Sequence, residues 1–205
     1  INCVESSYEF TKEQSSEKAA FGSYSLKLSS NTEIGWGAAR IYMSLGTNLG
    51  AEGSKALNMT YFGFHVIGPK GNENDVSTGN VLMQDLQIVN GSAWYSYKGG
   101  STYYMLADGE TTWTSAESIS SSVVIPGDFS GYVVVSVRDF GADSIADLLN
   151  PDGRTMFSMH FNKAGADYGS VYLDAFFYSD KDDGGSEPTK PIDPDEDPVC
   201  FEADR

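Results

Sequence analysis

The segment Gly22-Ser23-Tyr24-Ser25-Leu26-Lys27-Leu28 decides the fold class, because its large apolar residues recur at every second position. In an extended strand Tyr24, Leu26 and Leu28 share one face, and the polar residues between them share the other. Similar runs rich in Val, Ile, Tyr, Phe, Trp and Thr follow along the chain at Ala38–Leu45, Leu57–Ile67, Val81–Val89, Trp94–Tyr97, Tyr103–Leu106, Ser122–Ile125, Tyr132–Val137, Thr155–Phe161 and Val171–Tyr178. Turn pairs such as Asn90-Gly91 and Asp108-Gly109 separate many of them.

The order of these runs predicts an all-β fold. Only Ala142–Leu149 suggests a helical turn, and without crossover helices a parallel α/β sheet is excluded. The sequence therefore predicts an antiparallel two-sheet sandwich or jelly roll. The residues expected in its core are Leu26, Leu28, Phe62, Phe64, Val133, Val135 and Leu173.

Composition excludes several classes of partner. The chain has 205 residues, 29 acidic against 13 basic, and a formal net charge of −16. Such a chain repels phosphate backbones and anionic lipid surfaces, so we expect no nucleic-acid partner. No apolar stretch reaches the roughly 18–20 residues that span a bilayer, so no membrane insertion is expected either. Two cysteines are too few for a disulfide scaffold, and no cysteine or histidine spacing indicates zinc.

A change in composition divides the chain. Residues 1–179 form the predicted β-sandwich module, whereas residues 180–198 are an acidic linker rich in Pro and Gly. Beyond the linker, Cys200-Phe201-Glu202-Ala203 repeats the pattern of Cys3-Val4-Glu5-Ser6. We therefore expect residues 199–205 to be the first strand of a following, similar module.

Sequence motifs give no support for catalysis. The two histidines, His65 and His160, lie within apolar strand runs, where a core or sheet-face role is the ordinary one. Nucleophile-elbow, zinc-protease and phosphate-loop motifs do not occur. Most acidic residues of the module fall in turns, so a glycosidase would need a carboxylate pair that the sequence does not indicate. We expect no enzyme activity.

Four segments together resemble the galactose-binding-like β-sandwich modules, the jelly-roll carbohydrate-binding modules of bacterial surface and secreted multimodular proteins. They are Cys3–Ser6, Phe21–Leu28, Ile125–Tyr132 and Asp167–Phe177. The resemblance implies a noncatalytic module, extracellular or on the cell surface, that binds a glycan or polysaccharide and has neighbouring modules in the same polypeptide. The alternative is a structural or adhesive spacer module with no glycan ligand.

The same resemblance implies a structural calcium ion that joins the first strand to the last, with Glu5 and Asp174 as ligands. An aspartate flanked by Leu173 and Phe176 is costly to bury unless it is paired or bound to a metal, which agrees with this expectation. The alternative is that Asp174 caps a turn or accepts hydrogen bonds from backbone N–H groups.

Sugar binding needs an exposed aromatic ring that stacks on a pyranose, together with polar groups that hold hydroxyls. We expect Trp36 to be exposed, because Gly35 and Gly37 flank it and indicate a turn. The further candidates are Arg40, Trp94, Tyr97 and Trp113. Core packing is the alternative for the two other tryptophans, and a salt bridge with a nearby acid is the alternative for Arg40.

Overall fold

The computed structural model of the chain describes residues 4–7, 10–30, 36–44, 57–68, 80–90, 93–118, 123–148, 154–162, 170–180 and 188. Within these residues the strands form two antiparallel sheets. Sheet A has the order β1 (Val4–Ser7), β4 (Trp36–Ser44), β12 (Arg154–Asn162), β6 (Asn80–Asn90) and β10 (Val123–Pro126), and β7 (Ala93–Ser96) also pairs with β6. Sheet B has the order β2 (Phe10–Ser15), β3 (Ser25–Ser30), β13 (Ser170–Ser179), β5 (Tyr61–Ile67), β11 (Ser130–Ser136), β8 (Thr102–Ala107) and β9 (Thr114–Glu117).

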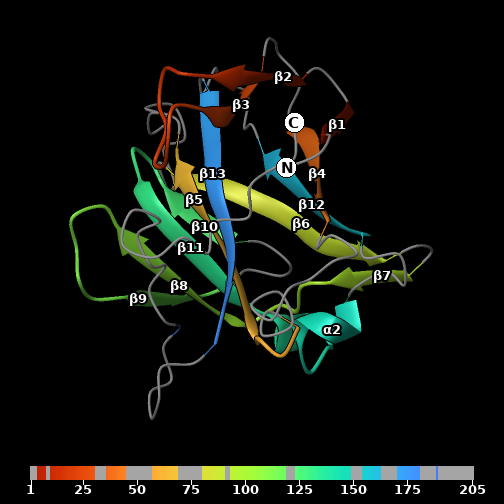
Figure 1. Ribbon diagram of the computed structural model, residues 1–205. Coiled ribbons are helices and arrows are strands. Elements are labelled where there is room, and N and C mark those ends of the chain that lie inside the picture. The colour runs from red at the N-terminus through yellow and green to blue at the C-terminus, as the bar shows by residue number, and fades with distance from the viewer. Residues whose placement is uncertain are drawn as a thin grey trace.

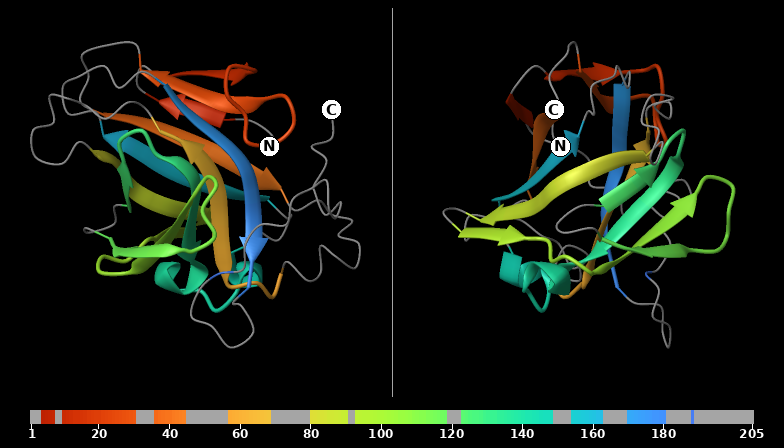
Figure 2. Two further views of the ribbon diagram at one scale, coloured as in Figure 1. Left: turned by 90° about the vertical axis from the view of Figure 1, so that its left-hand side faces the viewer. Right: turned by 180° about the vertical axis from the view of Figure 1, so that it is seen from behind.

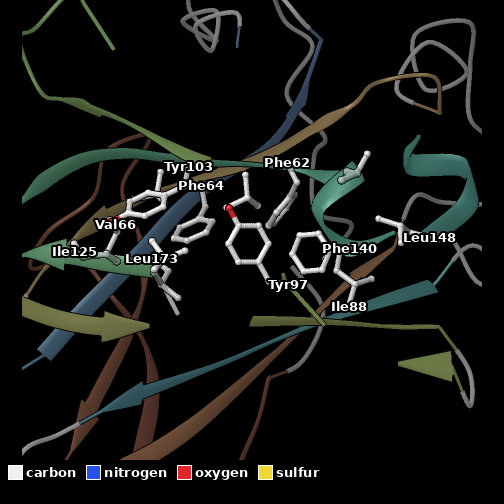
Figure 3. Close-up of a cluster of buried hydrophobic side chains, with 14 of the residues drawn as sticks. Phe62, Phe64, Val66, Ile88, Tyr97, Tyr103, Ile125, Phe140, Leu148 and Leu173 are labelled. Atoms are coloured by element: carbon white, nitrogen blue, oxygen red, sulfur yellow. The ribbon is translucent and has the colours of Figure 1, made fainter. Parts of the chain in front are cut away.

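The two sheets enclose a common core, and both are twisted (Figures 1 and 2). Sheet B contributes Phe62, Phe64 and Leu173, and sheet A contributes Ile88 and Ile125, each at most 2% exposed. Figure 3 shows these side chains meeting between the sheets. Burial of their apolar surface is the main source of stability in such a layer structure.

The predicted core is confirmed. Leu28, Phe62, Phe64, Val133, Val135 and Leu173 are buried, and Leu26 is partly buried against them. The predicted helical turn is also present, as α2 (Ile145–Leu148), which follows the 3₁₀ helix η1 (Val137–Phe140). Phe140, Ile145 and Leu148 of these helices are buried and close one end of the core. The all-β, antiparallel two-sheet fold class is therefore confirmed.

A second cluster covers the far side of sheet B. Tyr61, Leu106, Trp113 and Val134 are buried there, away from the core between the sheets. The ring of Phe177 packs over Gly63, where a Cβ atom would lie 2.4 Å from the ring. Sheet B is thus covered by its own aromatic side chains on the face that does not meet sheet A.

The expected linker and following module fall largely outside the described residues. Of residues 180–198 only Asp180 and Pro188 are described, and residues 199–205 are not. The domain boundaries therefore stay a prediction. In the described ranges no helix has the length and apolar character to cross a membrane.

Gly131 in β11 gives a test of the packing of sheet B. Its φ is +156°, and an added Cβ would lie 2.2 Å from the carbonyl oxygen of Leu106 and 2.7 Å from the Cα of Ala107. Backbone atoms cannot move aside as a flexible side chain can, so Gly131→Ala should cost about 3 kcal/mol of unfolding free energy in urea titrations. Gly22→Ala is the control, because Gly22 has φ +61° but open space around it, and it should cost about 1 kcal/mol. Equal costs for the two variants would contradict the close approach of β8 and β11.

Candidate functional site

Strands β6 and β7 identify which side of sheet A faces away from the core. Ile88 is buried in the core and pairs with Tyr95, which packs against that core. Gln87 pairs with Ser96 and Val89 pairs with Trp94, so these residues lie on the opposite side. Trp94 is 51% exposed, and Nε2 of Gln87 donates a hydrogen bond to Oγ of Ser96 at 3.2 Å. We call this side of the sheet the outer face.

Register extends the outer face over the whole sheet, because directly paired residues share a face. We name one line of paired residues the polar row: it crosses five strands and consists of Glu5, Arg40, Ser158, Gln87 and Ser96. Beside it runs the row of Tyr42, Met156, Val89 and Trp94. Beyond that row Ser44 pairs with Arg154.

On the other side of the polar row, β6 has a bulge relative to β12 between Ser158 and His160. Past the bulge, Val123 and Ile125 of β10 are buried, whereas Val124 between them is less so. Leu82 pairs with Val124, so it belongs to the outer face. Two further rows follow on that face: Ser7, Ala38, His160 and Gln84, and then Trp36, Asn162, Leu82 and Val124.

The outer face has the size of an extended binding surface. Trp36 lies six residues along β4 from Tyr42, which is in the row of Trp94. At about 3.4 Å per residue this is roughly 20 Å along the strands, and three strand spacings add about 14 Å across them. Trp36 and Trp94 therefore mark opposite corners, roughly 25 Å apart, of a face with polar residues between them.

Three of the five residues predicted to bind sugar lie on this face. Trp94 is exposed at its edge, and register places Trp36 and Arg40 on it. The expectation of a turn at Trp36 was wrong, because Trp36 is the first residue of β4 and pairs with Asn162. Glycine at position 37 does not end the strand, since Gly37 pairs with Phe161.

The prediction that Tyr97 and Trp113 bind sugar is wrong, because both side chains are buried. Tyr97 is 2% exposed and lies in the core, with its ring 5.2 Å from that of Phe140 (Figure 3). Burial raises the pKa of its hydroxyl above the ordinary value. Trp113 is 7% exposed and belongs to the cluster on sheet B. Both rings are buried because they fill apolar space, so neither is available to stack on a sugar.

Sequence reasoning missed most of the polar residues of the outer face. Tyr42, Gln84, Gln87, Arg154, Ser158 and Asn162 were not singled out, and His160 was considered only as a core or sheet-face residue. Their signal was present in the alternation of β12, where Arg154, Met156, Ser158, His160 and Asn162 alternate with Thr155, Phe157, Met159 and Phe161. The pairing partners in other strands were needed to show that these positions adjoin Arg40 and Gln87.

The surroundings of Asp174 match the alternative expected for it. Its Oδ2 atom accepts hydrogen bonds from the backbone N–H groups of Ala20 at 2.9 Å and Phe21 at 3.1 Å. Its Oδ1 atom accepts one from the N–H of Ala175 at 2.8 Å, at a bulge where Ala175 has φ +45°. Asp174 therefore holds the connection between β2 and β3 against β13.

These contacts do not fit a calcium site at Asp174. Converging N–H dipoles stabilise an anion and repel a cation. The side chain of Glu5 is outside the described part of the chain. Among the described residues no group of three or more His, Cys, Asp or Glu side chains is gathered as metal ligands. The calcium ion stays a prediction.

A second polar cluster lies on sheet B. Nε2 of His65 is 2.9 Å from Oδ1 of Asp108, and Oγ of Ser130 donates to Oδ2 of Asp108 at 2.5 Å. Burial raises the pKa of Asp108, but the hydrogen bonds from Ser130 and His65 hold this pKa below its ordinary value. The hydroxyl of Ser130 donates to the carboxylate and not to the imidazole, which is not the arrangement of a nucleophile and its base. The cluster ties β5, β8 and β11 together.

Comparisons with known proteins give distant structural similarities. No protein-family model matches the chain, and no curated protein does. The chain is similar to a solved structure described as a xylan-binding domain from carbohydrate-binding module family 22, with 10% identity and a TM-score of 0.39 over 87% of this chain and 86% of that one.

Two further solved structures show similarity of the same order. One is a family 30 carbohydrate-binding module, with 14% identity and a TM-score of 0.38 over 85% of this chain and 89% of that one. The other is a family 11 carbohydrate-binding module from Clostridium thermocellum in complex with a beta-1,3-1,4-mixed-linked tetrasaccharide, with 10% identity and a TM-score of 0.32 over 86% of each chain.

Asp174→Ala should lower the free energy of unfolding by about 2 kcal/mol, because three backbone N–H groups lose a charged acceptor. EDTA should leave the melting temperature of the parent unchanged, since amides rather than a cation satisfy the carboxylate. Asp143→Ala, which removes an exposed aspartate, is the control and should change the stability little. A melting temperature that falls in EDTA and recovers with calcium, in the parent but not in Asp174→Ala, would establish the calcium site instead.

Proposed function

We propose that this chain is a noncatalytic carbohydrate-binding module that holds a glycan on the outer face of sheet A. One observation carries the proposal: the half-exposed ring of Trp94 lies on the face opposite the core, beside the polar row. Stacking surfaces combined with hydrogen-bonding groups are what a pyranose requires.

The exposed end of the polar row supplies hydrogen-bonding capacity. Nε2 of Gln87 has a second N–H beyond the bond to Ser96, and both Oε1 of Gln87 and Oγ of Ser96 are acceptors. Sugar hydroxyls both donate and accept, so amides and hydroxyls in adjacent positions can hold them in a fixed orientation. Ser158 and Arg40 continue the row toward β1.

Trp36 supplies a second aromatic residue at the opposite corner of the face. A glycan chain that crosses the sheet diagonally passes from Trp94 over the polar row to Trp36. Such an extended face suits a polysaccharide better than a single sugar, because several sugar units can be contacted together. Weak contacts at each unit then add up to a useful affinity.

The wider setting belongs to the same proposal. We propose an extracellular or cell-surface protein in which this module is joined to neighbouring modules through the acidic segment 180–198. The second candidate is a structural or adhesive spacer module with no glycan ligand. The repeat of Cys3–Ser6 in Cys200–Ala203 favours it, because a repeated module can serve simply as a spacer.

Trp94→Ala tests the proposal. Loss of the ring should cost about 1–3 kcal/mol of glycan affinity, by analogy with bases that stack on aromatic side chains. The free energy of unfolding should change by less than about 1 kcal/mol, since half of the ring is already in water. Affinity gel electrophoresis on xylan, mixed-linkage β-glucan, galactan and polygalacturonate measures the first quantity, and urea unfolding measures the second.

Tyr24→Ala is the matched control, because Tyr24 is 55% exposed but precedes β3 of sheet B. Its glycan affinity should equal that of the parent. A folded Trp94→Ala variant that binds as tightly as the parent would remove the outer face from the proposal. A parent retarded by none of these polysaccharides would favour the spacer.

A further inference from the structure

Two of the four arginines of the chain lie on the outer face of sheet A. The four are Arg40, Arg138, Arg154 and Arg205. Register places Arg40 in the polar row and Arg154 opposite Ser44, two rows away. The chain as a whole carries a formal charge of −16, so two arginines placed on the same face of one sheet are contrary to its general character.

Among the residues that register places in the rows of the outer face, acidic residues do not balance these two arginines. In the rows of the outer face Glu5 is the one acidic residue, and it pairs with Arg40. Arg154 has serine as its partner across β4. Asp85 lies in the β6 bulge, between positions 84 and 87 that pair with β12, and belongs to no row. The rows thus carry two arginines against one glutamate.

We infer that the polysaccharide bound on the outer face contains uronic acids, whose carboxylates are held by Arg154 and Arg40; the inference rests on the proposed function. Guanidinium binds a planar carboxylate with two parallel hydrogen bonds, which gives both strength and orientation. Neutral hydroxyls need no cation, and Gln84, Gln87 and Asn162 already offer amides on the same face for them.

The spacing of the arginines fits repeated carboxylates along one chain. Arg154 pairs with Ser44, four residues along β4 from Arg40, so the two positions are roughly 14 Å apart. A polymer with acidic units at intervals can meet both arginines while its other units lie over the row of Trp94. Glu5 beside Arg40 weakens that contact, which makes Arg154 the stronger of the two.

The negative charge of the whole chain distinguishes a local cationic site from general electrostatic attraction. A strongly acidic protein is repelled by polyanions at long range, so attraction to one requires a local cationic site. Binding to an acidic polysaccharide should therefore depend on these two arginines and not on general electrostatics. It should also weaken as salt increases.

The test compares polygalacturonate with the same polymer after its carboxyl groups have been reduced to alcohols. Isothermal titration should show at least tenfold tighter binding to the acidic form. Arg154→Gln should remove most of this preference while it leaves binding to the reduced polymer intact. Arg138→Gln, which changes an exposed arginine of η1 near sheet B, is the control and should bind as the parent does. Thermal melting confirms that each variant is folded.

The failures of the two proposals are distinguishable. Equal binding to the acidic and reduced polymers would overturn the uronic-acid inference and leave glycan binding intact. The same conclusion would follow if Arg154→Gln and Arg40→Gln both kept the parent's preference for the acidic polymer. Equally tight binding to dextran sulfate would also overturn it, because the site would then respond to charge alone. Binding to neither polymer nor to any neutral glycan would overturn both proposals.

Discussion

The alternation of sheet A is the constraint on which the rest of the structure depends. Ile88, Val123 and Ile125 must be buried against sheet B, and this burial fixes which residues of the same strands face the other way. A shift of one residue in any pairing would exchange the two sets. The same strand register therefore determines both which residues are buried in the core and which residues form the outer face.

The two sheets differ in how far the side chains on the face away from the core are covered. Sheet B covers its far side with Tyr61, Trp113 and Val134, and with a polar cluster in which Asp108 joins His65 and Ser130. On sheet A, the described residues of β6 and β7 instead expose Trp94 and the hydrogen-bonded pair of Gln87 and Ser96. When a ligand covers a ring that is half exposed, apolar surface is removed from water, and this favours binding. A ring that is already packed has little exposed surface left to bury.

Alternation along single strands made much of the fold predictable from the sequence, including the core positions Leu28, Phe64 and Leu173. The same alternation explains the burial of Tyr97, because Tyr97 shares a face with Tyr95, which packs against the core, and not with Trp94. Composition alone misled at Trp36, because flanking glycines favour a turn but do not prevent pairing of a strand. The polar row could not be predicted, since Arg40, Ser158 and Gln87 become neighbours only through pairings between distant strands and through a bulge.

We propose the outer face of sheet A as the glycan surface, and the three tryptophans of the chain allow one measurement to test this. Trp36 and Trp94 belong to that face, whereas Trp113 is buried on sheet B. The indole N–H signals of the three residues can be followed by ¹H–¹⁵N NMR during titration with a glycan that the chain binds. We expect the signals of Trp94 and Trp36 to shift with the ligand concentration while that of Trp113 stays in place. A saturable binding isotherm in which Trp113 shifts and neither of the others does would contradict the account.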